Sequence, residues 1–558
     1  MSGFFSRERL INGPWQAFER AVERLLIVQG WDVVELVGGS GDNGADVIAS
    51  SADREVVYQA KHKSDNSDLS IPIVNDVKRA MEFYKINEGV CCSNRNLGRT
   101  QKQRLKELTS GDQGYNIVSF TGASILASFE KLPEWFDDGK SLRKHQEKAI
   151  EKLKRSFLNG TGRGLISLAT GLGKTFVAGT FINWIYKEKG AHLNILILAD
   201  KKSLIEQFDR AIWPFLPKSV STHLLYQSEK PSYDSGVTLA TFQSLVKYKE
   251  ENPELQYDIV IVDEAHHSMA PTYKDVIMGL DAKYLLGLTA TPFRRDNQRI
   301  EELFGSPLIK IGVEEAIKNH LLCKVNYILH TDNIDKDWIT LNSNQGYTIK
   351  QLNKKVFLPQ LDDAIAEIII NYWEKKGAKK GIIFCNSNEH CERVERIMRS
   401  QRIPTQSLTM RAGNNREQAK RLRAFRQGQL SIITCFDMLN EGIDVPDVDF
   451  IVFLRVTHSR TYFLQQLGRG LRRPKDNPEK ELLVLDFVAD LRRIGRVQAL
   501  NDGYNSSKKI EDIELPENFN LEITNEYTKN FIDLVENEEG EIDELDETGL
   551  VYLKKDNN

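Results

Sequence analysis

The chain contains few cysteines and no long apolar run. Six cysteines are scattered through 558 residues, and no pair of them has the spacing of metal ligands. Reduced thiols are therefore expected, as in a cytoplasmic protein. No apolar stretch approaches the roughly 20 residues that span a membrane, and residues 1–9 contain no apolar core of a secretion signal. We therefore expect a cytoplasmic protein with no membrane partner.

The chain also has little net charge for its length. The formal net charge is −4 and the isoelectric point is about 6.3, which argues against general coating of nucleic acid but allows a local basic channel. Apolar residues make up 41% of the chain, enough for several cores, and the length predicts roughly three to four domains. The acidic stretch 536–547 is expected to be a solvating tail, with autoinhibition of a DNA site as the alternative.

The first 130 residues are expected to form one small α/β domain. Residues 14–29 have the pattern of an amphipathic helix, with apolar side chains on one face at Trp15, Phe18, Val22, Leu25 and Leu26. Short β-rich runs follow at 31–37, 45–49 and 56–61, with a glycine-rich turn at 38–44. Residues 131–140 have the composition of a linker.

From residue 141 the pattern changes to buried strand, loop and helix, repeated. Strand-length apolar runs lie at 164–169, 194–199, 237–241, 259–262 and 284–288, and again at 380–385, 430–434, 450–453 and 481–486. Helical segments between most of them predict parallel sheets. The predicted fold class is α/β: an N-terminal α/β domain, then two tandem parallel-sheet domains at 141–325 and 326–490. Residues 491–558 form a C-terminal extension.

A phosphate-binding loop lies at Ala169-Thr-Gly-Leu-Gly-Lys-Thr175, between a predicted strand and a predicted helix. Backbone N–H groups around Thr170, Gly171 and Gly173 would face the phosphates, and the helix dipole favours negative charge there. Lys174 would reach the terminal phosphates and Thr175 would hold magnesium. The sequence therefore predicts an ATP site.

Two carboxylates follow the strand that ends at residue 262. Asp263 is expected to bind magnesium through water and Glu264 to orient the attacking water. Farther along, Gln465-Gln-Leu-Gly-Arg-Gly-Leu-Arg472 places Arg469 and Arg472 in the second parallel-sheet domain. An arginine supplied by the second domain would stabilise the transferring phosphoryl group of ATP. ATP hydrolysis would then require that the two domains close on each other. The alternative is an arginine-rich solvated helix face.

Residues 141–490 resemble a superfamily 2 helicase of the DEAH type, in the group of type I and type III restriction motor subunits and XPB-like helicases. The resemblance rests on the phosphate loop, Asp263-Glu-Ala-His266, Glu441-Gly-Ile-Asp444 and the segment 465–472. It implies two RecA-like domains. It also implies that Gln146 reads adenine, that Gly442, Asp444 and Gln465 contribute to the nucleotide site, and that Arg469 and Arg472 contact the γ-phosphate.

The same resemblance assigns further elements. Residues 199–207 and 240–244 resemble the elements that contact the nucleic-acid strand. Thr289 and Thr291, in the segment 288–296, resemble the motif that couples hydrolysis to strand grip. Among the alternatives that remain open is an RNA helicase, which the N-terminal domain disfavours.

The N-terminal domain carries a second candidate site. Asp46 follows the glycine-rich turn, and Gln59 and Lys61 lie two residues apart, hence on one face of a strand. Glu19 lies at the edge of the apolar helix face. Metal-dependent phosphodiester cleavage needs such a set: Asp46 and Gln59 to hold magnesium, and Lys61 to offset charge or position water.

With Phe18-Glu19, Gly41–Asp46 and Tyr58–Lys61, the domain resembles the Mrr-like branch of the PD-(D/E)xK endonucleases. We therefore expect an ATP-dependent DNA helicase or translocase with a magnesium-dependent endonuclease, in restriction or antiphage defence. Duplex DNA is the expected partner. Partner defence subunits would supply target recognition, and dimers would form on DNA. The alternative is a non-cleaving remodeller in repair, whose N-terminal domain only binds DNA.

Overall fold

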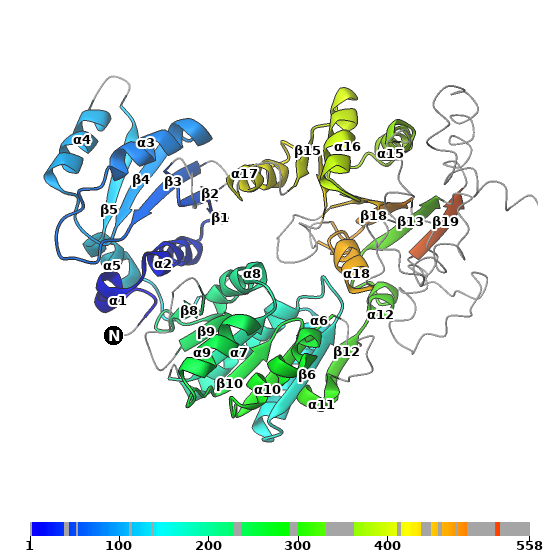
Figure 1. Ribbon diagram of the computed structural model, residues 1–558, viewed down its shortest axis with the longest axis horizontal. Helices are drawn as coiled ribbons and strands as arrows, with labels where there is room; N and C mark the ends of the chain where they lie inside the picture. Colours follow the sequence, from blue (N-terminus) through cyan, green and yellow to red (C-terminus); the bar gives the residue numbers. More distant parts are fainter. Residues whose placement is uncertain are drawn as a thin grey trace, which may run out of the picture. The chain divides into compact units, whose positions relative to one another are not determined.

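The computed structural model describes most of the chain, namely residues 3–37, 44–51, 54–110, 114–136, 139, 141–190, 192–226, 236–290, 300–330, 362–409, 415–436, 448–455, 460–474, 477–487 and 519–524 (Figure 1). The chain divides into two compact units. One comprises Met1–Ile166 and Gly173–Ile309, and the other comprises Ser167–Leu172 and Lys310–Asn558. Within the described ranges, no helix has the length and apolar character needed to cross a membrane.

The N-terminal domain is built on a mixed sheet with strand order β1-β2-β3-β4-β5. Its strands are β1 Val33–Leu36, β2 Val47–Ser51, β3 Arg54–Lys61, β4 Glu88–Ser93 and β5 Asn116–Thr121. Its helices are α1 Arg7–Asn12, α2 Trp15–Val28, α3 Ile73–Tyr84, α4 Arg99–Thr109 and α5 Gly122–Glu130. The β1–β2 and β2–β3 pairs are antiparallel, whereas β3–β4 and β4–β5 are parallel.

Apolar side chains cover both faces of this sheet, because the strands alternate their side chains from one face to the other. Helices α2 and α5 contribute to the core on one face and α3 to the core on the other. On α2, Phe18, Val22 and Leu25 are buried as predicted. Trp15 departs from that pattern: 55% of it is exposed. It belongs to the first turn of α2, beyond the edge of the core.

The first parallel-sheet domain has strand order β12-β6-β11-β10-β7-β9-β8. Its strands are β6 Arg163–Leu168, β7 Asn194–Ala199, β8 Thr222–Leu224, β9 Gly236–Thr241, β10 Ile259–Val262, β11 Tyr284–Thr289 and β12 Pro307–Ile311. Its helices are α6 Lys144–Leu158, α7 Lys174–Lys189, α8 Lys202–Ile212, η1 Trp213–Phe215, α9 Phe242–Glu251, η2 Ala265–Met269, α10 Pro271–Met278 and α11 Glu301–Phe304. The central strands are almost entirely apolar: β10 is apolar throughout and β7 is apolar after Asn194, as expected for a sheet covered on both faces.

The second parallel-sheet domain has strand order β15-β16-β14-β17-β18-β13-β19. Its strands are β13 Lys324–His330, β14 Gly381–Cys385, β15 Thr405–Leu408, β16 Ile432–Cys435, β17 Phe450–Leu454, β18 Glu481–Asp486 and β19 Phe519–Thr524. Its helices are α12 Val313–Lys318, α15 Asp362–Lys376, α16 Asn388–Ser400, α17 Asn415–Arg426 and α18 Arg460–Gly468. The predicted class, an N-terminal α/β domain followed by two tandem parallel-sheet domains, is confirmed.

One strand of the second sheet comes from far along the chain. β19 pairs in parallel with β13, with Val325 opposite Phe519 and Leu329 opposite Ile523. β19 lies within the stretch 491–558 that the sequence analysis assigns to an extension. That extension therefore contributes backbone hydrogen bonds to the second sheet.

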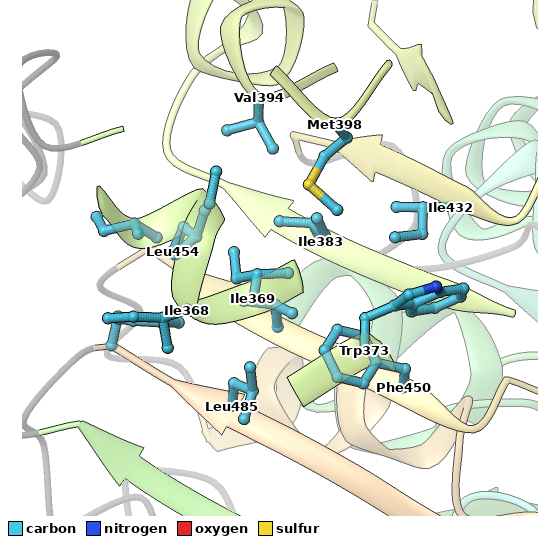
Figure 2. Close-up of a cluster of buried hydrophobic side chains, with 14 of the residues drawn as sticks. Ile368, Ile369, Trp373, Ile383, Val394, Met398, Ile432, Phe450, Leu454 and Leu485 are labelled. Carbon is cyan, nitrogen blue, oxygen red and sulfur yellow. The ribbon is translucent and has the colours of Figure 1, made fainter. Parts of the chain in front are cut away.

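The core of the second domain lies between its sheet and helices α15 and α16. Figure 2 shows Ile369 and Trp373 of α15 and Met398 of α16 pointing toward Ile383 and Phe450 on neighbouring strands. The Trp373 ring meets Phe450 edge to face, with ring centroids 5.3 Å apart. This core fixes the strands whose carboxyl ends carry the candidate residues of the second domain.

We expect Trp373→Ala to destabilise the second domain by about 3–5 kcal/mol, because it removes a large buried ring and leaves a cavity. Denaturant unfolding followed by circular dichroism measures the shift. Trp15→Ala is the matched control, since it removes an exposed tryptophan and should change stability by less than about 0.5 kcal/mol. Equal effects of the two substitutions would contradict the packing described for Trp373.

Candidate nucleotide and nuclease sites

The phosphate loop lies at the carboxyl end of β6. Gly171 and Gly173 have φ angles of 91° and 86°, a region that favours glycine. Helix α7 begins at Lys174 directly after Gly173, and no side chain caps its N-terminus. Its first backbone N–H groups can therefore donate to an anion, with the helix dipole favouring negative charge.

Lys174 and the two carboxylates after β10 lie at the same edge of the first sheet. The Lys174 Nζ atom is 3.6 Å from Oε1 of Glu264, and both side chains are largely buried. Asp263 follows β10, where its backbone N–H donates to the carbonyl oxygen of Leu198 at 2.8 Å. Glu264 has a φ of 45°, in the left-handed region, which is costly for a residue with a side chain. The backbone thus holds Glu264 in a strained position toward the loop.

The electrostatics differ between the two carboxylates. Burial, with the neighbouring Glu264 charge, raises the pKa of Asp263 to about 7. Burial also opposes ionisation of Glu264, but the positive charges of Lys174, His266 and His267 outweigh it and lower the pKa of Glu264. Glu264 therefore stays ionised and can accept a hydrogen bond from water. A cation bound beside Asp263 would favour its ionised form and lower that pKa again.

A short chain of polar contacts runs from Glu264 to β11. The His266 Nδ1 atom is 3.5 Å from Oε2 of Glu264, and the Thr289 hydroxyl is 3.5 Å from the same nitrogen. Thr289 is fully buried at the end of β11, which lies between β6 and β10 in the sheet. The assigned coupling residue is thereby joined to the candidate catalytic acid. Thr291 lies outside the described residues.

Gln146 lies beside the loop. Its Oε1 accepts a hydrogen bond from the backbone N–H of Arg143 at 2.9 Å, which closes a capping box at the start of α6. A Cβ atom on Gly173 would lie 2.5 Å from Nε2 of Gln146, so a larger residue there would push that amide aside. Adenine reading by Gln146 stays a prediction that this position supports.

Residues Ser167–Leu172, which include the start of the phosphate loop, belong to the same compact unit as the second domain. Two residues of that domain, Gly468 and Arg472, lie close to the loop. A Cβ atom on Gly468 would lie 2.6 Å from Cγ2 of Thr170, and one on Gly171 would lie 3.5 Å from Cγ of Arg472. Gln465 belongs to α18, and its Oε1 atom is buried without a hydrogen-bond partner.

The remaining candidates of the second domain are placed only in part. Arg469 follows α18 directly and is half-buried. Gly442 and Asp444 lie outside the described residues. The roles of all these residues stay predictions.

In the N-terminal domain, Asp46 and Gln59 are in contact at one end of the β2–β3 pair. Oδ2 of Asp46 accepts hydrogen bonds from Nε2 of Gln59 and from the backbone N–H of Ala60, the latter at 2.6 Å. Asp46 is 3% exposed and Gln59 is fully buried. The Gln59 Oε1 atom has no hydrogen-bond partner. A buried carbonyl oxygen without a donor is costly, and a metal ion would satisfy it.

The other two candidate nuclease residues are Lys61 on β3 and Glu19 on α2. Lys61 is the last residue of β3, on the same face as Gln59, and is half-buried opposite Ser93 of β4. Glu19 lies on α2, and the neighbouring Phe18 ring approaches the ring of His62 with centroids 5.9 Å apart. Because His62 directly follows Lys61, that contact brings the start of α2 to the end of β3. Helix α2 packs on the face of β3 that carries Val56, Tyr58 and Ala60, whereas Gln59 and Lys61 alternate onto the opposite face. Asp46, Gln59 and Lys61 thus lie at one end of the sheet, and the role of Glu19 stays a prediction.

The oxygen ligands at both sites are few. Among the described residues, no group of three or more His, Cys, Asp and Glu side chains could hold a metal ion by itself. Magnesium differs from zinc in needing no such cage, since it keeps several waters and binds one or two carboxylates with substrate phosphates. Asp263 with Thr175, and Asp46 with Gln59, fit that kind of site.

Sequence reasoning missed one set of charged residues. Arg20, Glu23 and Arg24 on α2, with Asp209 and Arg210 on α8, form ion pairs and hydrogen bonds between the N-terminal and first parallel-sheet domains. Charged residues of an amphipathic helix usually lie on its solvated side, so the sequence alone does not indicate that these are buried. Burial of Glu23, Arg24 and Asp209 is visible only in the fold.

Three family models match the chain, in the order of its domains. A restriction endonuclease model matches residues 11–117, a model of the type III restriction enzyme res subunit matches 139–294, and a helicase conserved C-terminal domain model matches 360–474. The resemblance drawn from the motifs is confirmed by these matches.

Two curated relatives represent the two helicase groups. The chain is 25% identical over 386 residues to the endonuclease subunit of the type I restriction enzyme EcoAI of Escherichia coli, covering 63% of this chain and 47% of that subunit. It is 26% identical over 363 residues to the DNA 3'-5' translocase XPB2 of Sulfurisphaera tokodaii, covering 58% of this chain and 77% of the translocase. The chain thus spans about half the length of the restriction subunit.

A solved structure supports the fold alone. The ATP-dependent type ISP restriction-modification enzyme LlaBIII bound to DNA superposes with a TM-score of 0.53 at 15% sequence identity. The superposition covers 96% of this chain and 43% of that one. All three domains of the chain therefore have counterparts in one known architecture.

Proposed function

We propose that this chain, which carries a restriction endonuclease domain ahead of a res-subunit motor domain and a helicase C-terminal domain, moves along duplex DNA at the expense of ATP and cuts it. The observation that supports the proposal is that two separate clusters in one chain hold residue types suited to phosphate chemistry. Lys174 and Glu264 are 3.6 Å apart at the phosphate loop, and Asp46 contacts Gln59 at the end of the N-terminal sheet.

In the motor, the loop N–H groups and Lys174 bind the phosphates of ATP, and Glu264 orients the attacking water. Thr289 and His266 connect Glu264 to the end of β11, so a change at the nucleotide reaches the edge of the sheet. Arg469 and Arg472 stabilise the charge that develops on the transferring phosphoryl group. Because they belong to the second domain, turnover requires that the motor domains close.

In the nuclease, Asp46 and Gln59 hold magnesium by their side-chain oxygens, and Glu19 is a second candidate acid. The metal, when bound, lowers the pKa of a water and stabilises the leaving oxygen. Lys61 positions that water or offsets charge on the phosphate. The Gln59 oxygen without a partner supports this assignment over a domain that only binds DNA.

The biological setting follows from the relatives. Restriction or antiphage defence in the cytoplasm is the proposed setting, with target recognition supplied by partner subunits. One nuclease site per chain favours two copies meeting on DNA to cut both strands. The second candidate function is a non-cleaving remodeller. It would be favoured only if the Asp46 site cleaves no DNA that is tested.

The nucleic-acid partner is tested by ATPase stimulation. We expect long duplex DNA to raise the steady-state ATPase several-fold and RNA to leave it unchanged, because a restriction endonuclease domain acts on DNA. The measurement is phosphate release with saturating duplex DNA or RNA in parallel, with Lys174→Ala as the blank. Stimulation by RNA and not by DNA would contradict the proposal and favour an RNA helicase.

A further inference from the structure

Helix α2 is buried on two opposite sides. At 3.6 residues per turn, Phe18, Val22 and Leu25 lie on one side, and Arg20 and Arg24 lie on the other. The apolar side packs into the core of the N-terminal domain. The charged side faces the first parallel-sheet domain, which belongs to the same compact unit. Buried arginines need hydrogen-bond acceptors or negative charges nearby, so the surface that faces this side of α2 must supply them.

The deepest contact is made by Arg24, which is 1% exposed. Its guanidinium donates to the carbonyl oxygen of Val220 at 2.7 Å and to that of Pro217 at 3.2 Å. The Phe4 ring lies against the same group, 4.1 Å from its central carbon. One arginine of the N-terminal domain is thus held by two backbone carbonyls of the motor domain.

Two ion pairs cross between α2 and α8 in opposite directions. Arg20 Nε of α2 is 3.3 Å from Oδ2 of Asp209 on α8, and Arg210 Nε of α8 is 2.9 Å from Oε1 of Glu23 on α2. Glu23 is fully buried and Asp209 is 1% exposed. Trp213 donates its indole N–H to Asp209 at 2.8 Å. Each helix therefore supplies one acid and one base, and slipping one helix along the other would leave buried charges unpaired.

Contacts on either side extend this interface. Arg9 donates to the carbonyl oxygen of Thr222 at 3.2 Å. The backbone N–H of Phe4 donates to the carbonyl oxygen of Lys218, also at 3.2 Å. The Lys218 ammonium group in turn donates to the carbonyl oxygen of Leu132 at 2.7 Å. Leu132 belongs to the stretch 131–140 that the sequence analysis reads as a linker. The two domains are joined by side chains and backbone as well as by that connection.

Both helices of the interface lie next to residues with a predicted function. Glu19, a candidate catalytic residue of the nuclease, lies one helical turn before Glu23 on α2. Helix α8 overlaps residues 199–207, the element that resembles a strand-contacting motif. The interface thus lies between the part of the motor assigned to grip DNA and the helix that carries part of the nuclease site.

We propose that Arg20, Glu23, Arg24, Asp209 and Arg210, here called the α2–α8 interlock, fix the nuclease domain to the first motor domain as one mechanical body. The nuclease domain then moves with that motor domain and is not connected to it by a flexible linker alone. This inference rests on the proposed function for its consequence, which is that ATP-driven movement sets where DNA is cut. The interlock itself stands on contacts that need no catalysis, and it can be tested without any.

The first test is calorimetric unfolding of the full chain with and without a non-hydrolysable ATP analogue and magnesium. A ligand that binds the folded motor raises the unfolding temperature of everything that unfolds with it. In the native chain, the analogue should raise the transition of the nuclease domain together with that of the motor. In Arg20→Ala/Arg24→Ala, the nuclease domain should unfold separately, at least about 5 °C lower, and should no longer respond to the analogue.

Matched variants keep this test interpretable. Arg79→Ala/Arg99→Ala removes two exposed arginines from the same domain and should behave as the native chain. Arg9→Ala, at the rim of the interface, should give a smaller separation if the double variant fails to fold. Native nuclease and motor domains that already unfold independently, or an interlock variant that responds to the analogue like the native chain, would overturn the inference.

The second test is catalytic and separates the two proposals. The interlock variant should keep its ATPase and its magnesium-dependent cutting of short duplexes within about threefold. It should lose the ATP-dependent rise in cutting of long DNA. A loss of both kinds of cutting would indicate simple misfolding and count against the interlock. No cutting by the native chain would refute the proposed nuclease, and the calorimetric result would still decide the inference.

Discussion

Lys174→Ala abolishes ATP hydrolysis, with kcat lowered by at least about 10²-fold, the loss typical when one preorganised charge-stabilising group is removed. The substitution removes the ammonium group that reaches the terminal phosphates. It also removes the positive charge that does most to lower the pKa of Glu264, 3.6 Å from its Oε1 atom. Burial of Glu264 is then less well compensated and its pKa rises, so the acid that orients water is weakened as well. Steady-state phosphate release with saturating DNA measures the effect.

Lys189→Ala is the matched control, because it removes a lysine from the exposed last turn of the same helix, α7. It should leave ATP hydrolysis unchanged within about twofold, since surface substitutions change little. Both variants should unfold at denaturant concentrations close to that of the native chain. ATP hydrolysis that survives in Lys174→Ala would mean that the loop at 169–175 is not the catalytic phosphate site.

Lys61→Ala abolishes magnesium-dependent DNA cleavage, by at least about 10²-fold, because the phosphate loses a positioned positive charge. Its ATPase stays at the native level, because Lys61 lies in another domain from the phosphate loop. Lys61 is a cleaner target than Asp46. It is half-buried at the end of β3, whereas Asp46 is 3% exposed and accepts two hydrogen bonds that hold the β2–β3 pair. Asp46→Ala would leave both donors unsatisfied.

Lys78→Ala serves as the matched control for Lys61→Ala, since it removes a partly exposed lysine of α3 that pairs with Glu82 on the surface. Cleavage of a long linear duplex, followed on a gel, should be the same in this control as in the native chain. A loss of ATPase in Lys61→Ala would contradict the independence of the two sites. Cutting that persists in Lys61→Ala would remove this residue from the nuclease site.

The parts of both sites that could be predicted are those set by local rules. Gln59 and Lys61 share a face because side chains alternate along a strand, and Asp46 meets Gln59 because a tight connection joins two antiparallel strands. Likewise Lys174 and Asp263 both follow buried parallel strands, so they lie at one edge of the sheet. Periodicity and strand order contain this information without any tertiary contact.

The parts that could not be predicted depend on distant partners. The burial of Arg24 depends on the carbonyls of Pro217 and Val220, almost two hundred residues away. Trp15 has an apolar side chain at the right spacing, yet it is exposed because the domain core ends before the first turn of α2. The pairing of β19 with β13 joins segments about two hundred residues apart. Sequence patterns describe faces and ends of elements, but they do not identify the partner.

The most direct measurement is cleavage of long unmodified and modified duplex DNA with magnesium, with and without ATP, by the native chain beside Lys61→Ala and Lys174→Ala. The account predicts cutting by the native chain that rises with ATP, no cutting by Lys61→Ala under any condition, and no ATP-dependent rise in Lys174→Ala. No cutting by the native chain on any DNA, with ATPase intact, would contradict it and leave a motor whose N-terminal domain only binds DNA.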